Sequence, residues 1–354
     1  MCKKIIVTNV AIIFLLTKIS SLWYTKSVMY LRNYVSEFLA EKGIFMKAAT
    51  TPTLYFIGVT TENSSIIDVF PKWADALGLK DTVISGIDLP IHAPVEDYRD
   101  AVAFLKEDPL SMGALVTTHK IDLFNACRDM FDYIDPYAQM LGEVSCLSKR
   151  DGKFCAHAKD PISSGLALEN FVPENFWVDY NGEVVLLGAG GSSLAMSMYF
   201  AQEKFASNVP RKITICNRSI PRLESAKTHL ENLFNRIDFE FVHTPSPQDN
   251  DAVIAKLPPY SLVVNATGLG KDMPGSPTTD NILYPKNSLV WEINYRGELL
   301  FKQQALAQKD SRAIHVEDGW KYFIFGWTQV ISEVFNLPIE KNTLDRLADI
   351  AKHV

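Results

Sequence analysis

The sequence predicts an α/β protein with two domains, the second of them a doubly wound parallel sheet of the Rossmann type. A glycine-rich turn, Gly188-Ala-Gly-Gly191, follows the apolar, strand-like residues 183–187 and precedes residues 192–201, whose apolar spacing is helical. Strand-like and helix-like segments alternate on both sides of this turn, as in sheets that are covered by helices. The length of 354 residues also favours about two domains.

Composition and charge favour a small molecule as the partner. The hydrophobic content of 47% is sufficient for two cores, and the net charge of −6 creates no field that would attract nucleic acid or an anionic membrane. The cysteines are scattered, without the spacing of a metal site, so no metal is expected and the thiols are predicted to be free or buried in a reducing compartment. They are Cys2, Cys127, Cys146, Cys155 and Cys216.

The glycine-rich turn is suited to the pyrophosphate of a dinucleotide. Gly188 can take the tight bend, Gly190 lets the backbone approach the phosphates, and the following helix N-terminus supplies N–H groups and a positive dipole end. Ser193 replaces the third glycine of the usual pattern, and a small residue there still permits close packing. A purely structural turn is the alternative interpretation. The predicted pyrophosphate-binding residues are Gly188, Ala189, Gly190, Gly191 and Ser192.

The next two strands indicate which dinucleotide binds. Residues 212–216 form a strand that ends in Asn217-Arg-Ser219, where an NAD site usually has an acidic residue. Arg218 could instead pair with a 2′-phosphate, so NADP is favoured and NAD stays possible; a solvated arginine is the alternative. The strand at 261–266 leads into Thr267-Gly-Leu-Gly270, whose glycines allow a backbone to pass close to a cofactor.

Apolar patterns and turn residues also predict elements elsewhere. Strands are expected at 53–57, 82–85 and 114–117, helices at 70–77, 101–106, 322–335 and 343–353, a hairpin turn at Asp151-Gly152, and a surface loop at 245–251.

Residues 1–46 do not fit this pattern. Lys3 and Lys4 precede an apolar run at 5–16, as in a signal peptide or a short anchor, although the run is short for a membrane span. Three interpretations stay open: a start codon upstream of the true one near Met46, a membrane anchor, and an added packing helix. A cytoplasmic protein is the default expectation, and a membrane contact is expected only if this leader is real.

In this order, the segments resemble the shikimate and quinate dehydrogenase family from about Leu54 to the last helix. The resemblance is carried by Val116-Thr-Thr-His-Lys120, Asp160, Gly188-Ala-Gly-Gly191, Asn217-Arg-Ser219 and Asn265-Ala-Thr-Gly-Leu-Gly270. It implies hydride transfer between NADP and a ring hydroxyl or ketone of a shikimate- or quinate-like cyclic hydroxy acid. It also implies an extension at 1–46, a substrate-binding domain at 47–164, a dinucleotide domain at 165–318, and helices at 319–354 that pack back on the first domain.

The resemblance also implies site residues. Lys120 and Asp160 would be catalytic: a nearby carboxylate should keep Lys120 protonated, so Lys120 would stabilise charge and relay a proton while Asp160 orients the alcohol. A surface lysine and a turn aspartate are the alternative. The other residues expected at the cofactor are Asn217, Arg218, Ser219, Ala266, Thr267, Gly268 and Gly319, and those expected at the substrate are Ser64, Thr117, Ser145 and Tyr295.

Several positions depart from the family pattern. Ile66 replaces the second of two substrate-binding serines, Glu143-Val-Ser-Cys146 replaces Ala-Val-Asn-Thr, and Gly326 replaces a glutamine. These departures indicate a different or broader substrate, such as another cyclic polyol or an aminoshikimate-type compound. A non-catalytic NADP-binding regulatory module is a further alternative, and a homodimer stays open. His119 and His157 flank the candidate catalytic pair and are expected to be packing or surface residues.

Overall fold

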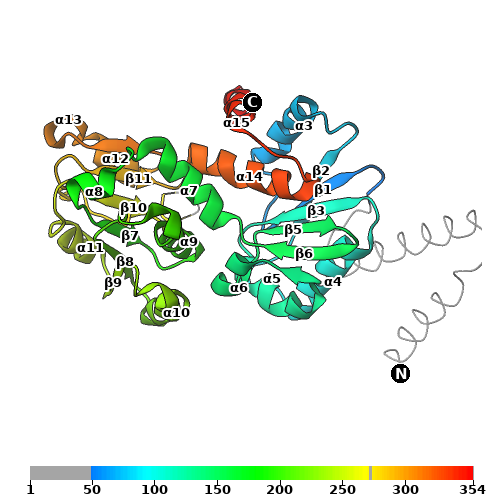
Figure 1. The fold of residues 1–354 in the computed structure, drawn as a ribbon, viewed down its shortest axis with the longest axis horizontal. Helices are drawn as coiled ribbons and strands as arrows, with labels where there is room; N and C mark the ends of the chain where they lie inside the picture. Colours follow the sequence, from blue (N-terminus) through cyan, green and yellow to red (C-terminus); the bar gives the residue numbers. More distant parts are fainter. Residues whose placement is uncertain (1–48, 271–272, 354) are drawn as a thin grey trace, which may run out of the picture.

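The computed structural model describes residues 49–270 and 273–353. The predictions for residues 1–46 concern a segment outside these ranges. Two six-stranded sheets lie apart in the molecule, and helices α7 and α14 run between them (Figure 1). In the described part of the chain, no helix combines the length and apolar character needed to cross a bilayer.

The first sheet is mixed and has the strand order β2-β1-β3-β5-β6-β4. Strands β1, β2 and β3 are parallel, whereas β5 is antiparallel to both β3 and β6. The strands are β1 (Thr53–Gly58), β2 (Val83–Asp88), β3 (Ser111–Val116), β4 (Tyr133–Ile134), β5 (Cys146–Arg150) and β6 (Lys153–His157). The helices of this part are α3 (Ile66–Leu77), α4 (Val95–Glu107), α5 (Lys120–Cys127) and α6 (Pro136–Leu141).

The predicted hairpin turn is confirmed. Asp151 and Gly152 join β5 to β6 with φ angles of 52° and 71°, the left-handed conformation that a two-residue hairpin turn requires at both positions. Helices α3 and α4 were recognised but begin earlier than predicted. The helix predicted at 70–77 begins at Ile66, so that Pro71 lies within its first two turns.

The second sheet is entirely parallel, with the order β12-β11-β10-β7-β8-β9, and confirms the doubly wound prediction. The order reverses between β7 and β10, and ligands of such sheets bind at this point, beyond the carboxyl ends of the strands. The strands are β7 (Val184–Leu187), β8 (Lys212–Asn217), β9 (Asp238–His243), β10 (Leu262–Asn265), β11 (Leu289–Glu292) and β12 (His315–Glu317). The helices are α7 (Asp160–Phe171), α8 (Phe176–Tyr180), α9 (Gly191–Phe200), α10 (Ile220–Leu230), α11 (Pro247–Ile254), α12 (Leu300–Leu306) and α13 (Lys309–Arg312).

The surface loop predicted at 245–251 is wrong, because helix α11 begins at Pro247. Ser246 and Asp249 form a capping box, in which each side chain bonds the backbone N–H of the other residue, and Pro247 occupies the first helical position. The proline, serine and aspartates suggested a loop by composition, but Ser-Pro-x-Asp is also a helix start signal.

The last two helices return to the first sheet, as predicted. Helix α14 (Trp320–Phe335) contacts β3 and β5, and α15 (Lys341–Lys352) packs on α3, where the Trp73 indole donates a 2.8 Å hydrogen bond to the Leu347 carbonyl. The exact domain limits stay a prediction, since α7 itself spans the predicted boundary at 164–165. The four cysteines in the described ranges are buried and free.

Candidate active site

A cleft of about 350 Å³ lies between the two sheets and is closed on one side by α14. Its walls come from the ends of β3 and β10, from the first turns of α5 and α7, and from one face of α14. The residues that line it are Leu115, Val116, Thr117, Lys120, Ser145, Lys159, Asp160, Ser163, Ser192, Ala266, Thr267, Gly268, Ile293, Asn294, Tyr295, Tyr322, Phe323, Gly326, Trp327 and Val330.

Lys120 and Asp160 meet in this cleft as an ion pair. Each is the first residue of its helix, and the Lys120 ammonium donates a hydrogen bond to Asp160 Oδ2. The side chains are 24% and 13% exposed, so the pair is reachable from the cleft and shielded elsewhere. Burial opposes the positive charge on Lys120, but the carboxylates of Asp160 and Glu143 outweigh it and raise the lysine pKa above its ordinary value.

Two further ionisable side chains surround this pair, and neither was predicted. Glu143, which precedes β5, is buried, and the loss of hydration raises its pKa to about 7 despite the opposing charge of Lys120. Burial and the Asp160 carboxylate raise the pKa of Tyr322 well above its ordinary value, although hydrogen bonding to Ser192 opposes this. The replacement of the family's alanine by Glu143 was the sequence signal that could have identified it.

A second cleft, of about 440 Å³, lies at the point where the second sheet reverses its order. The residues that line it are Gly188, Ala189, Gly190, Cys216, Asn217, Arg218, Ser219, Arg222, Thr244, Pro245, Ser246, Pro247, Asn250, Ala266, Thr267, Gly268, Leu269, Met273 and Pro277. Residues 266–268 line both clefts, so a ligand in the second cleft reaches the wall of the first.

The glycine-rich turn fits a pyrophosphate. Gly188 has a φ of 114°, and a Cβ there would lie 2.6 Å from the carbonyl oxygen of Ala266, so only glycine is suited to this bend. A Cβ on Gly190 would meet no heavy atom within 4 Å, which leaves space at the N-terminus of α9. Ser193 donates a 2.6 Å hydrogen bond from Oγ to the Gly188 carbonyl, so the serine braces the turn.

Two exposed arginines suit the extra phosphate of NADP. Arg218 and Arg222 line the second cleft at the start of α10, and Asn217 Oδ1 fixes the connection by accepting a 2.9 Å hydrogen bond from the Ser219 N–H. Cations at a helix N-terminus interact unfavourably with the positive end of the helix dipole, so a bound anion would offset this repulsion. Arg222 was missed, although its position four residues after Arg218 was a readable signal.

Four predicted contact residues have other surroundings. Ser64 is half-buried in the loop before α3 and is not among the residues that line either cleft. A Cβ on Gly191 would lie 2.6 Å from Glu143, and a Cβ on Gly319 would lie 2.0 Å from the Ile293 carbonyl, so both glycines allow close packing. Ser145 lines the first cleft, but its hydroxyl already accepts a 2.7 Å hydrogen bond from the Lys159 N–H. Their ligand contacts stay predictions.

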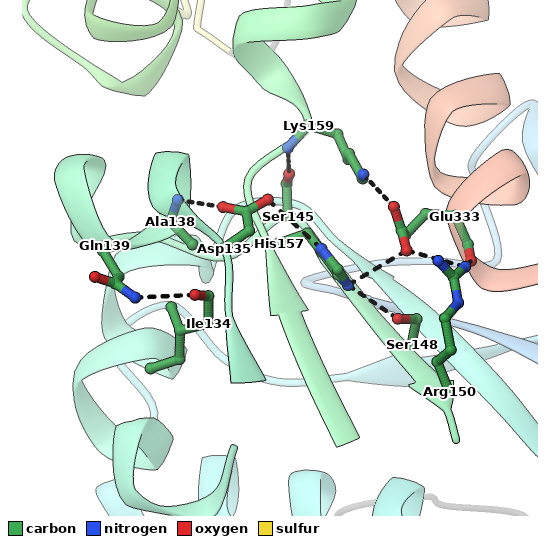
Figure 2. A network of polar contacts seen from close by, with 10 residues as sticks. All are labelled: Ile134, Asp135, Ala138, Gln139, Ser145, Ser148, Arg150, His157, Lys159 and Glu333. Carbon is green, nitrogen blue, oxygen red and sulfur yellow. Dashed lines mark hydrogen bonds and ion pairs between the residues drawn. The ribbon is translucent and has the colours of Figure 1, made fainter. Parts of the chain in front are cut away.

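The two flanking histidines are both buried. His119 Nδ1 lies 3.1 Å from the Tyr98 hydroxyl, and burial lowers its pKa. His157 belongs to the polar network of Figure 2, which joins β6 to α14 through the Glu333 carboxylate. In the same network the ammonium of Lys159, the residue before Asp160, lies 2.5 Å from Glu333 Oε2, so it anchors the start of α7 to α14.

Among the described residues there is no group of three or more His, Cys, Asp or Glu side chains that could hold a metal ion.

The fold and the clefts define a two-domain α/β protein with a mixed first sheet and a Rossmann-type second sheet. No protein-family profile matches the chain. It is 24% identical over 227 residues to the shikimate dehydrogenase (NADP(+)) of Bacillus cereus strain AH187, covering 64% of this chain and 73% of that protein.

Two solved structures share the architecture. The quinate dehydrogenase of Corynebacterium glutamicum in complex with NAD superposes with a TM-score of 0.66 at 21% identity, covering 86% of this chain and 99% of that one. The shikimate 5-dehydrogenase of Listeria monocytogenes in complex with shikimate and NAD gives a TM-score of 0.64 at 16% identity, with coverages of 86% and 98%. In sequence the chain is similar to shikimate dehydrogenases, and its fold is that of the shikimate and quinate dehydrogenases.

Proposed function

We propose that this protein is an NADP-dependent dehydrogenase that transfers a hydride reversibly between NADP and a ring hydroxyl or ketone of a shikimate- or quinate-like cyclic hydroxy acid. The observation that carries the proposal is the Lys120–Asp160 ion pair in a cleft that shares residues 266–268 with the dinucleotide cleft. NAD is the alternative cofactor. A cytoplasmic location and a homodimer stay predictions from the sequence.

The residues present fit the cofactor. Residues 188–190 would hold the pyrophosphate, Arg218 and Arg222 the 2′-phosphate, and residues 266–268 the nicotinamide end. Bound NADP supplies the hydride acceptor for alcohol oxidation. The protein must then stabilise the oxygen as it loses its proton, and the Lys120 ammonium is positioned to do this because it is charged and partly shielded from water.

Asp160 has the complementary role, because its carboxylate can accept a hydrogen bond from the substrate hydroxyl and hold it beside Lys120. Asp160→Asn is expected to raise KM for the alcohol and to lower turnover, because the amide cannot balance the lysine charge. Steady-state kinetics at saturating NADP would measure both effects. Asp151→Asn, in the exposed hairpin turn of the same domain, is the control and should leave both constants unchanged.

The two arginines give a test of cofactor preference. Arg218→Ala and Arg222→Ala should each weaken NADP binding by about tenfold, roughly one charge-assisted hydrogen bond, while NAD binding stays nearly constant. The dissociation constants of both cofactors can be measured by titration calorimetry. Lys227→Ala, which removes an exposed cation from the same helix, is the matched control. An unaltered protein that binds NAD as tightly as NADP would contradict the preference.

The far end of the substrate cleft favours a second candidate, a dehydrogenase of another cyclic polyol or of an aminoshikimate-type substrate. Ile66 is fully buried in the apolar core, so it offers nothing to a substrate carboxylate. The cleft is open at Gly326, since a Cβ there would meet no heavy atom within 4 Å. The apolar side chains of Trp327 and Val330 also line this cleft.

A substrate panel tests both candidates. Shikimate, quinate and aminoshikimate are each incubated with NADP or NAD, and the reduced nicotinamide is followed by absorbance. Shikimate is expected to be a weaker substrate than it is for enzymes with both serines. Cofactor binding without turnover of any panel member would instead support a non-catalytic regulatory module.

A further inference from the structure

Glu143 is the most unusual ionisable group near the candidate active site. Glu143 is only 2% exposed, and its Oε1 is buried without a hydrogen-bond partner in the described part of the chain. A buried carboxyl oxygen without a donor is costly, so such a group usually has a specific role. Glu143 does not line the substrate cleft, so it would act through a neighbour.

The neighbours of Glu143 are the reacting pair and the dinucleotide turn. The residue after it, Val144, donates a 3.1 Å backbone hydrogen bond to the carbonyl of Lys120. On the other side, Glu143 Oε2 lies 2.6 Å from the position that a Cβ on Gly191 would take, at the N-terminus of α9. The absence of a side chain at Gly191 therefore leaves the space that this carboxyl group occupies beside the dinucleotide turn.

Three helices place an ionisable group near this carboxyl. They are α5 with the charged Lys120 ammonium, α7 with the Asp160 carboxylate, and α14 with the neutral Tyr322 hydroxyl. On the α10 side, His229 lies against Gly142, the residue before Glu143. The N-terminus of α9 adds a partial positive charge through Gly191. Burial and Asp160 favour the neutral carboxyl and Lys120 favours the carboxylate, with the result that the pKa of Glu143 is raised to about 7.

We propose that Glu143 is a positioning residue that receives, through Lys120, the proton released when the substrate alcohol is oxidised. This inference rests on the proposed dehydrogenase function. As the hydride leaves the substrate carbon for the cofactor, the O–H bond breaks and its proton passes to Lys120 Nζ. One N–H bond of the ammonium breaks in return and an O–H bond forms on Glu143, so Lys120 remains charged and the ketone is formed. In the reverse direction the same carboxyl returns the proton.

The chemistry of the pair explains why a third group is useful. Lys120 is held in its protonated form, so it cannot keep an additional proton, and Asp160 is already ion-paired with it. A buried acceptor with a pKa close to neutral can take the proton at little cost in free energy in either direction. The position beside Gly191 also predicts that an ionised Glu143 weakens the binding of an anionic pyrophosphate at the turn.

Glu143→Gln tests the proposal because it keeps the size of the side chain and removes its ionisation. In the unaltered enzyme, kcat for alcohol oxidation should rise with pH through about 7, because Glu143 accepts a proton only when ionised. The kcat of the variant should no longer depend on this ionisation, and it should be about tenfold to a hundredfold lower. Glu143→Asp should restore an ionisation. Glu292→Gln is the matched control, because Glu292 is also buried with a pKa raised to about 7 by burial, and it should keep the pH dependence.

A binding measurement does not depend on turnover. The dissociation constant of NADP is compared between Glu143→Gln and the unaltered protein at about pH 6 and about pH 8.5, on either side of the expected ionisation. The variant should bind about equally at the lower pH and about threefold or more tightly at the higher pH. An affinity ratio that is the same at both pH values, or a variant with full turnover and an unchanged pH profile, would overturn the proposal. If no panel substrate is turned over, the dehydrogenase function fails, and the affinity ratio alone decides the placement of Glu143.

Discussion

Replacement of Lys120 by alanine is expected to lower turnover by about 10²-fold to 10⁴-fold, the range for a positioned proton-transfer group. The ammonium lies against Asp160 and keeps its charge in a mostly buried site, so its loss removes the group that would stabilise the oxygen during hydride transfer. Steady-state kinetics on the best substrate of the panel would measure the loss.

Cofactor affinity should separate this effect from unfolding. NADP should bind to Lys120→Ala nearly as it does to the unaltered protein, because the predicted nucleotide contacts are made by the turns after β7 and β8. Lys153→Ala, which removes an exposed lysine from β6, should leave turnover unchanged and serves as the control. Full turnover in Lys120→Ala would show that the reacting groups lie elsewhere, even if the protein proves to be a dehydrogenase.

Local rules were sufficient where the backbone itself determines the structure. The turn at Gly188 and the hairpin at Asp151 and Gly152 were predicted because their dihedral angles restrict which residues can occupy them. The parallel sheet followed from the alternation of apolar runs, since strands buried on both faces are almost continuously apolar. The same reasoning failed at Ser246, where residues typical of loops also form a helix cap.

The surroundings of the Lys120–Asp160 pair could not be predicted in the same way. Glu143 and Tyr322 are far apart in the sequence. The pairing of β5 with β6 brings Glu143 near Asp160, and the return of α14 to the first sheet brings Tyr322 there. A pKa shift depends on burial and on neighbours from several elements, and no local pattern reports either quantity. For Ile66, the sequence showed that the residue differs from the serine of the family pattern, but only the structure shows that its side chain is buried in the core.

The largest expected effect on stability is at Trp73. Its side chain is fully buried in the apolar cluster formed by α3, α14 and α15, and its indole N–H bonds the Leu347 carbonyl at 2.8 Å. Trp73→Ala would leave a large cavity and remove this hydrogen bond, so it should lower the free energy of unfolding by about 3–5 kcal/mol.

The same change should also loosen the substrate cleft. Trp73 holds α15 on α3, and the cluster it belongs to includes Trp327 and Val330 of α14, which line the cleft. Urea unfolding followed by circular dichroism would measure the stability, with Ile91→Ala as the control because Ile91 is 61% exposed and its truncation should cost less than about 1 kcal/mol. The free energy of unfolding of Trp73→Phe, which keeps an aromatic ring but not the N–H, should lie between those of Trp73→Ala and Ile91→Ala. Equal unfolding free energies for Trp73→Ala and Ile91→Ala would mean that the terminal helices do not depend on this contact.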